Sequence, residues 1–148
     1  MSISAKVPFE TTLLVRDHCL CLHMQRAARK VARVFDDVLR PYNLTNGQFS
    51  LLMSLNRPKP PGMAPVASLL AMDRTTLTAA LKPLVRRNLI KIKANPDDKR
   101  SRLLSLTPTG HRLLLRALPI WKETHAMIEK LLLSADRLRS DLQTLAGF

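Results

Sequence analysis

The stretch from residue 63 to 107 constrains the fold more than any other part of the chain, because two helix patterns precede two alternating strands. Residues 63–72 favour a short helix, since Pro65 lies in the first turn, where its missing N–H costs little. A brief turn follows, and Asp73 is a good N-cap for a second helix over residues 74–87. The residues expected to face the core are Val66, Leu69 and Leu70, followed by Leu77, Leu81, Leu84 and Val85.

A β-hairpin with a basic tip is predicted next. Residues 89–93 alternate Ile90 and Ile92 with lysines, which is typical of a half-buried strand. Residues 95–98 have the composition of a turn, and residues 102–106 return as the second strand. The predicted order is a short helix, a tight turn, a second helix with a polar outer face and a basic hairpin. This is the order of elements in a winged helix-turn-helix domain.

Further helices are predicted on both sides of this segment. Apolar residues at helical spacing indicate a long helix over residues 17–40, which Pro41 ends. Thr45 begins a capping box with the glutamine three residues on. Thr107 and Ser134 are N-caps for two more helices. The apolar stripes of these last helices are Leu114, Leu118, Trp121, His125, Ile128 and Leu132, then Leu138, Leu142 and Leu145.

The fold class is therefore predicted to be mainly α with a small β-hairpin wing, in a single domain over residues 1–148. The winged helix-turn-helix lobe spans residues 44–107. No element of the chain is long enough to cover both terminal apolar stripes. We therefore expect a homodimer whose interface is built from residues 17–40 and 108–147.

The charge of the chain favours a nucleic-acid partner. The 148 residues carry 24 Lys+Arg and 11 Asp+Glu, for a net charge of +13. Residues 57–102 hold 11 basic and 3 acidic residues, which gives this middle segment +8. The sequence has neither of the glycine-rich patterns that hold the phosphates of nucleotides. We expect no cofactor, and the leading function is not that of an enzyme. One Trp, one Tyr and four Phe are too few for a protein that stacks on single strands.

Three further expectations concern the location of the protein. The first ten residues contain no apolar segment of the kind found in secretory signals. No stretch approaches the roughly 18 apolar residues that a membrane span requires, so we expect no membrane association. The chain has two cysteines, which are too few for a disulfide scaffold and fit a reducing cytoplasm.

The second helix of the lobe is the candidate recognition helix, because its outward side chains could reach base edges in the major groove. Arg74 suits guanine, whereas threonines suit the methyl group of thymine. Lys82 and Arg86 lie further along and suit phosphates. Arg100 in the wing, residues 94–102, suits the narrow minor groove of A·T tracts. The candidate contacts are Arg74, Thr75, Thr76, Thr78, Lys82, Arg86, Asp98, Lys99, Arg100 and Arg102.

Several motifs resemble the MarR family (multiple-antibiotic-resistance regulator) of bacterial transcription factors. They are Leu44-Thr45-x-x-Gln48-Phe49, Val66-Ala67-x-Leu69-Leu70, Asp73-Arg74-Thr75-Thr76-Leu77-Thr78 and Asn88-Leu89-Ile90. Most specific is Asp97-Asp98-Lys99-Arg100-Ser101-Arg102-Leu103-Leu104-Ser105-Leu106-Thr107-x-x-Gly110, which is similar to the family's wing signature.

The resemblance covers about residues 17–133 and carries several implications. It implies a homodimer with interlocked terminal helices on a palindromic DNA operator. It also implies repression that is relieved by a small ligand or an oxidant, and a wing in which Asp98 braces Arg100. The chain departs from the family pattern at Ala79, where many relatives carry Arg, and at Pro83, which lies inside the recognition helix.

The two cysteines, Cys19 and Cys21, are candidate redox residues. At a spacing of two on an intact helix they point about 200° apart, so they cannot form a disulfide with each other. Cys21 falls roughly where peroxide-sensing relatives carry a reactive cysteine, and Cys19 shares a face with His23. The simpler alternative is that both thiols act as small apolar residues. A metal site is not expected, since one helix cannot surround a metal with its ligands.

Three functions remain open from the sequence. A sequence-specific DNA-binding regulator, released by a small ligand or by thiol oxidation, would prefer its operator to random DNA by a factor of about 10³ or more. A non-specific architectural or RNA-binding protein would bind any duplex alike. A thiol enzyme using Cys19 with His23 would need a substrate site, and the sequence has no motif for one.

Overall fold

The computed structural model describes residues 5–147, and the chain divides after Val34 into two units. The first unit contains α1 (Phe9–His18) and about the first four turns of α2 (Leu20–Leu39). None of the described helices is both long and apolar enough to cross a lipid bilayer.

The prediction of one continuous helix over residues 17–40 is wrong, because the chain leaves the helical conformation at Cys19. Cys19 has φ −69° and ψ 109°, which is the extended conformation of an N-cap residue. Its Sγ lies 3.5 Å from the backbone nitrogen of Leu22, and its carbonyl accepts the N–H of His23. Cys19 thus ends one helix and begins the next. Apolar periodicity alone could not reveal the break, since apolar residues continue on both sides of it.

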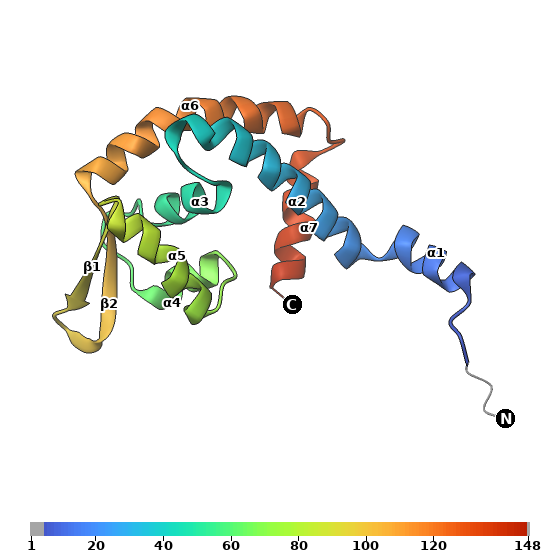
Figure 1. Ribbon diagram of the computed structural model, residues 1–148, viewed down its shortest axis with the longest axis horizontal. Coiled ribbons are helices and arrows are strands. Elements are labelled where there is room, and N and C mark those ends of the chain that lie inside the picture. Colours follow the sequence, from blue (N-terminus) through green and yellow to red (C-terminus); the bar gives the residue numbers. More distant parts are fainter. Residues whose placement is uncertain (1–4, 148) are drawn as a thin grey trace. The chain divides into compact units, whose positions relative to one another are not determined.

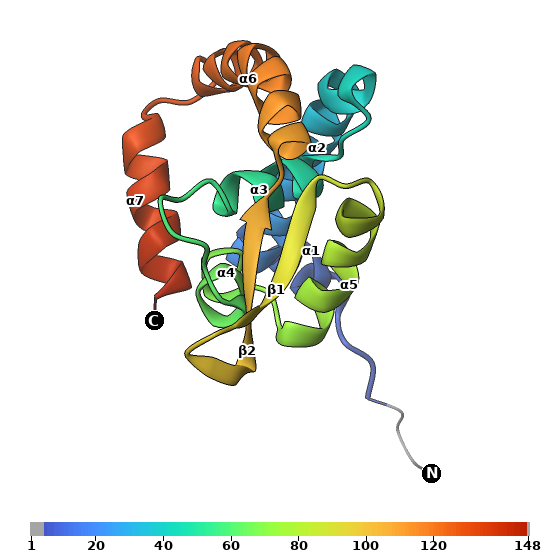
Figure 2. The same ribbon diagram turned by 90° about the vertical axis from the view of Figure 1, so that its left-hand side faces the viewer.

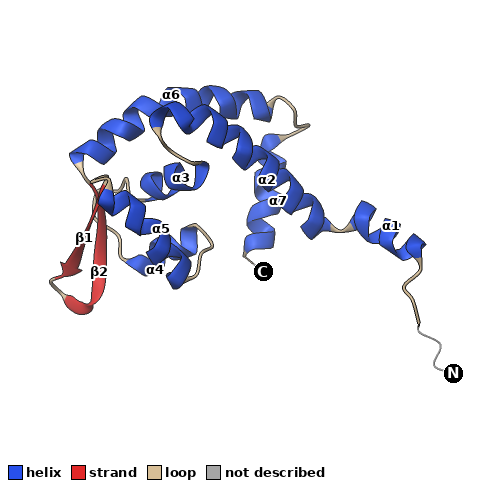
Figure 3. Ribbon diagram, in the orientation of Figure 1, coloured by secondary structure: helices blue, strands red, loops and turns tan. Residues whose placement is uncertain are grey.

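The second unit, from Phe35 onward, holds the end of α2 and the remaining elements. A 3₁₀ turn over Arg40–Tyr42 contains Pro41. In chain order the other elements are α3 (Asn46–Ser54), α4 (Met63–Leu69), α5 (Arg74–Arg86), β1 (Ile90–Asn95), β2 (Asp98–Leu106), α6 (Pro108–Glu129) and α7 (Ala135–Ala146). Helices α3, α4 and α5 gather beneath α6, and the two strands form a hairpin beside them (Figure 1, Figure 3). This arrangement confirms the mainly helical, winged helix-turn-helix fold.

Side-chain caps begin four of these helices as predicted. Thr45 Oγ1 accepts the N–H of Gln48, whose side chain in turn accepts the N–H of Thr45. Asp73, Thr107 and Ser134 each accept a backbone N–H from three residues further along. Each cap satisfies a donor that the first turn of a helix leaves without a partner.

The core of the second unit lies between the helices and the base of the hairpin. Leu77, Leu81 and Leu84 of α5 are buried as predicted, as is Val66 of α4. The other buried apolar side chains are Phe35, Leu39, Leu44, Phe49, Leu51, Leu52, Leu55, Leu89, Ile90, Leu104, Leu114 and Ala117. Trp121 of α6 stacks against three rings from the same unit: Phe35, Phe49 and His125.

Several residues predicted to be buried are exposed instead. Leu69 is 64% exposed, Val85 41% and Ile92 42%. Each lines an open hollow between elements and does not pack into the core: Leu69 lies beside Trp121, and Val85 and Ile92 lie between α5 and the hairpin. Leu132, predicted to lie on the stripe of α6, falls beyond the end of that helix and is 39% exposed.

The hairpin is longer than predicted. Its second strand begins at Asp98, not at Arg102, and pairs with β1 in antiparallel register from Ile90 opposite Leu106 to Ala94 opposite Arg102. Residues 99–101 then lie between this ladder and the last pair, Asn95 opposite Asp98, so the tip is irregular. Figure 2 shows the two strands side by side, with the tip directed away from α6.

Candidate nucleic-acid interface

The turn between α4 and α5 sets the start of the recognition helix. Ala71 adopts a left-handed conformation with φ 51°, while the N–H of Met72 donates to the carbonyl of Ala67 at 2.9 Å. This is a Schellman-type end to α4, although alanine occupies the position that usually belongs to glycine. The chain therefore reverses within a few residues and presents the first turn of α5 to solvent.

Asp73 holds that first turn in place. Its Oδ1 accepts the N–H of Thr76 at 2.7 Å, and this hydrogen bond lowers the pKa of the Asp73 carboxyl. The Thr78 hydroxyl donates to the carbonyl of Arg74 at 2.8 Å. This bond uses the hydroxyl proton and leaves the methyl group and the oxygen lone pairs of Thr78 for a partner. The outward side chains of α5 named above, Arg74, Thr75, Thr76, Thr78, Lys82 and Arg86, are all exposed.

The end of α5 is joined firmly to the wing and to α6. Asn88 has φ 54°, the left-handed conformation in which asparagine, after glycine, commonly follows the end of a helix. The buried hydroxyl of Thr107 donates to the carbonyl of Asn88 at 2.6 Å and accepts the N–H of Gly110 at 3.0 Å. One side chain therefore connects the recognition helix, the second strand and the start of α6.

Side-chain contacts with the backbone shape the tip of the wing. Asn95 Oδ1 accepts the N–H of Asp97, and Asp98 Oδ1 accepts the N–H of Arg100, both at 3.0 Å. The family resemblance implies that Asp98 braces Arg100, and the contact found here is to the backbone of that residue. Within the described chain no ion pair joins the two side chains, so the guanidinium of Arg100 remains available to a partner.

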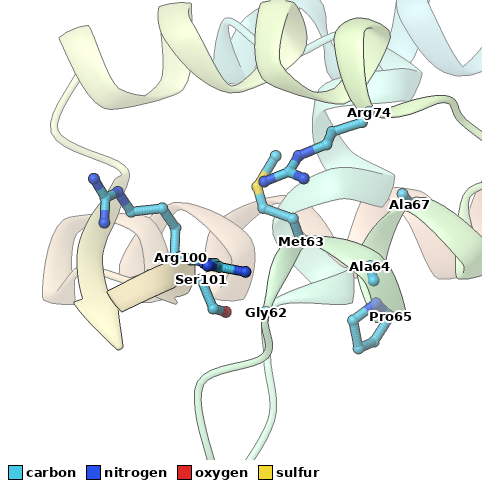
Figure 4. Close-up of a pocket in the computed structure, with 9 residues that line it drawn as sticks. Gly62, Met63, Ala64, Pro65, Ala67, Arg74, Arg100 and Ser101 are labelled. Atoms are coloured by element: carbon cyan, nitrogen blue, oxygen red, sulfur yellow. The ribbon is translucent and has the colours of Figure 1, made fainter. Parts of the chain in front are cut away.

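The wing is also attached to the start of α4. The N–H of Leu104 donates to the carbonyl of Pro61 at 2.9 Å, and Gly62 pairs with Leu103 as an isolated bridge. A hollow of about 460 Å³ opens at this junction, and Arg74, Arg100 and Arg102 are among its lining residues. Figure 4 shows Arg74 reaching toward Met63 from α5, with Arg100 on the opposite side in the wing.

A second hollow, of about 590 Å³, continues along α5. Its lining includes Thr78, Lys82 and Arg86 of the helix, and it shares Met63, Arg74 and Arg102 with the first hollow. The structure thus brings the two predicted groups, helix and wing, to one continuous surface. Thr75, Thr76, Asp98 and Lys99 are exposed but line neither hollow. Sequence reasoning missed Met63, because a lone methionine at the start of a helix carries no signal of its position.

The two thiols lie in the first unit, on α2 and at its cap. Cys21 is exposed, and its Sγ lies 3.4 Å from the side-chain amide of Gln25. Cys19 is half-buried, and His23 Nδ1 lies 2.8 Å from the carbonyl oxygen of Cys19, while the sulfur of Cys19 lies 3.5 Å from the backbone nitrogen of Leu22. Within the described part of the chain, neither thiol makes a hydrogen bond to a cationic side chain. Across residues 5–147, no group of three or more His, Cys, Asp or Glu side chains could hold a metal ion.

Comparison with known proteins gives consistent matches. The model of the MarR family matches residues 44–101. MosR of Mycobacterium tuberculosis in complex with DNA is similar in structure, with a TM-score of 0.81 at 32% identity, over 87% of this chain and 94% of that one. The repressor CouR of Rhodococcus jostii, bound to a DNA duplex, gives a TM-score of 0.74 at 27% identity over 96% and 97% of the two chains.

A protein of Bacillus subtilis is similar in sequence. This organic hydroperoxide resistance transcriptional regulator is 30% identical over 101 residues, which are 68% of this chain and 69% of that one. The family model, the relatives and the solved structures agree with the winged helix-turn-helix fold. The chain belongs to the MarR family and is a DNA-binding transcriptional regulator.

Proposed function

We propose that this regulator acts in the cytoplasm as a homodimeric repressor that binds a palindromic operator, with α5 in the major groove and the wing in the minor groove. The observation that carries the proposal is the shared arginine surface. Arg74 of α5 and Arg100 and Arg102 of the wing line one hollow, and no carboxylate is among its lining residues. DNA lying along α5 would meet these guanidinium groups at the phosphates and groove edges beside the wing.

The proposed dimer rests on apolar side chains that the described chain leaves uncovered. Leu138, Leu142 and Leu145 form a stripe along α7 and are each about 40% exposed. Leu131 and Leu133, in the loop before α7, are 84% and 110% exposed. Burial of a leucine side chain contributes about 1.5–3 kcal/mol, so a second copy that covers these residues gains substantial stability. Sedimentation at micromolar concentration should give a dimer, and a species of 17 kDa alone would contradict the proposal.

The wing is tested by Arg100→Ala. This change should weaken operator binding by about 1–3 kcal/mol, as expected for a specific contact, and leave thermal unfolding unchanged. The control is Arg112→Ala, because Arg112 is an exposed arginine of α6 whose side chain bonds Thr109. Equal gel-shift titrations for Arg100→Ala and the wild type would refute the role of the wing.

The salt dependence tests the charge argument. If about eight to ten phosphates are neutralised per dimer, the slope of log K against log[salt] should be about −7 to −9. Lys82→Ala should make the slope less steep by about one unit per subunit and weaken all sequences alike. Thr75→Ala should change the base preference with little change of slope. A slope near −2 would mean that the basic middle of the chain does not face DNA.

Release by a small ligand is the proposed mode of control. A hollow of about 330 Å³ lies between α3 and α6, and its lining includes Phe49, Met53, Leu118 and Trp121. None of its lining residues is charged, and this volume is at the lower end for small-molecule sites. Small uncharged aromatic compounds should quench Trp121 fluorescence and release the operator at the same concentrations. Release without any change in Trp121 fluorescence would place the ligand elsewhere.

Thiol control is the alternative, and the exposed Cys21 is the observation in its favour. A redox-sensing cysteine needs thiolate character, which a nearby cation provides. The group beside Cys21 is the uncharged amide of Gln25, so we expect low peroxide to leave operator binding intact. Loss of binding in peroxide that reductant restores, and that Cys21→Ser abolishes, would establish the alternative.

A further inference from the structure

A basic stripe runs along one face of α2, outside the surface formed by α5 and the wing. It consists of Arg26, Arg29, Lys30 and Arg33, which follow the helical spacing i, i+3, i+4, i+7. All four side chains are exposed. From Arg26 to Arg33 the stripe extends about 10 Å, at a rise of 1.5 Å per residue.

The stripe is not neutralised by its neighbours in the described chain. Residues 18–35 contain no Asp or Glu, and the acidic residues at either end have other partners. Asp17 is paired with Arg16, and Asp37 with Arg40, both at 2.6 Å. Asp36 Oδ1 accepts the N–H of Asn46 at 2.7 Å. Four positive charges thus stand close together with no carboxylate within ion-pair distance among the described residues.

The chemistry of the stripe favours a phosphate backbone over a protein surface. The four cations, with His23 and Ala27, line a shallow hollow of about 580 Å³. Ala27 is its only apolar lining residue, whereas protein interfaces rely on aromatic and aliphatic anchors at their centre. Three of the four cations are arginines, whose planar guanidinium groups bind phosphate in a bidentate manner.

The length of the stripe favours a polymer over a small anion. A single phosphate or diphosphate is too short to reach all four cations. A DNA duplex carries one negative charge per about 1.7 Å of its axis, or about six along a stripe of this length. Non-specific binding of this kind needs only phosphate contacts and no base readout.

We propose that the stripe of Arg26, Arg29, Lys30 and Arg33 is a second DNA-binding surface, which binds the phosphate backbone of duplex DNA other than the segment read by α5 and the wing. This DNA is either a flank of the operator or a separate duplex, and both present the same backbone. The stripe needs neither the recognition helix nor the operator sequence, so it does not depend on the proposed mode of operator recognition.

The test compares two triple variants with equal loss of charge. Arg26→Gln/Arg29→Gln/Arg33→Gln removes most of the stripe. Lys122→Gln/Lys130→Gln/Arg137→Gln is the matched control, since these three cations are exposed on α6, at its end and on α7. Circular dichroism and thermal melting establish that each variant is folded. Should the stripe variant fail to fold, Arg26→Gln/Arg33→Gln takes its place.

The first measurement is bridging. An operator duplex just long enough for one dimer is fixed to beads, and a labelled duplex without the operator is offered in solution. The wild type and the control variant should capture the labelled duplex, and the stripe variant should capture at least tenfold less. All three should bind the short operator within about twofold of one another. The proposal would be overturned if the stripe variant captured as much labelled duplex as the wild type. It would also be overturned if the stripe variant lost as much binding to the short operator as it lost capture.

The second measurement distinguishes a flank of the operator from a separate duplex. It also distinguishes DNA binding by the stripe from operator recognition by α5 and the wing. Extending the operator by 20 base pairs on each side should strengthen binding of the wild type, but not of the stripe variant, if the flank is the partner. Binding to a non-operator duplex is then measured in a Lys82→Ala/Arg100→Ala background. Loss of the three arginines there should make the salt slope less steep by about three units per subunit, or about five to six per dimer.

This second result stands even if no operator is recognised, so it distinguishes failure of the stripe from failure of the proposed function. An unchanged salt slope would overturn the proposal. Tenfold tighter capture of an RNA duplex than of DNA would also overturn it, in favour of an RNA partner.

Discussion

Substitution of Gly110 by alanine tests whether the wing and α6 are packed as closely as the structure indicates. A Cβ at Gly110 would lie 2.2 Å from the carbonyl oxygen of Leu89 and 3.1 Å from its carbonyl carbon. The oxygen cannot simply move away, because it accepts the N–H of Thr107 at 3.0 Å. An ordinary contact requires α6 and the end of the recognition lobe to separate by about 1 Å, and such overpacking costs about 1–3 kcal/mol.

Helix propensity predicts the opposite sign. Alanine is favoured over glycine by about 1 kcal/mol inside a helix, and Gly110 lies in the first turn of α6. We expect the clash to dominate, with a net loss of about 2 kcal/mol in the free energy of unfolding. For a chain of this length that loss lowers Tm by about 4–8 °C. The measurement is thermal unfolding at a fixed protein concentration, since dimerisation makes Tm depend on concentration.

Gly47→Ala is the matched control for this prediction. Gly47 lies in the first turn of α3, and the nearest atom to its added Cβ is Thr45 Oγ1 at 4.0 Å. This variant should therefore be as stable as the wild type or slightly more stable. A Tm for Gly110→Ala at or above that of Gly47→Ala would refute the close contact between α6 and Leu89.

Three further substitutions test a hydrogen bond, a turn residue and a helix cap of the winged lobe. Thr107→Val should reduce the free energy of unfolding, measured in urea, by about 1–3 kcal/mol, because the carbonyl of Asn88 then lacks a hydrogen-bond donor. Thr107→Ser keeps the hydroxyl and should retain most of the stability of the wild type. Ala71→Gly should raise Tm, since the left-handed φ of 51° costs alanine about 1–2 kcal/mol, and a lower Tm would contradict this account of the turn. The Asp73 carboxyl has a lowered pKa in the folded protein, so its contribution is full above the unfolded pKa of about 3.9 and is lost as pH falls through the lower folded pKa. The wild type should therefore lose stability in thermal melts below about pH 4, and Asp73→Asn should lose less over the same pH range. If both proteins lose the same stability at acid pH, the Asp73 cap does not cause the loss.

Much of the winged lobe could be predicted because its signals are local. The cap at Thr45, the left-handed Asn88 and the N-cap of α6 all involve partners within a few residues, so sequence spacing determines them. The turn residues at 95–98 likewise lie next to one another, and the hairpin forms where they predict it. These contacts are decided by the order of residue types, whatever the rest of the chain does.

Local signals failed where packing partners decide the outcome. Ile92 alternates with lysines as a half-buried strand should, yet it is 42% exposed because it lines an open hollow between α5 and the hairpin and does not pack into the core. Val85 has the helical spacing of a core residue but lies at the edge of the buried side of α5. The break at Cys19 was missed because a single extended residue leaves the apolar pattern around it intact.

The sequence by itself determined the type and order of the elements, the caps that begin them and the concentration of positive charge in the middle of the chain. Only the tertiary structure decided that Arg74, from a helix, shares a hollow with Arg102, from a strand 28 residues later. It also decided that Gly110 must lack a side chain, because the carbonyl of Leu89 lies against it. The physical reason is that residue spacing governs contacts within an element, whereas contacts between elements depend on how their buried faces pack.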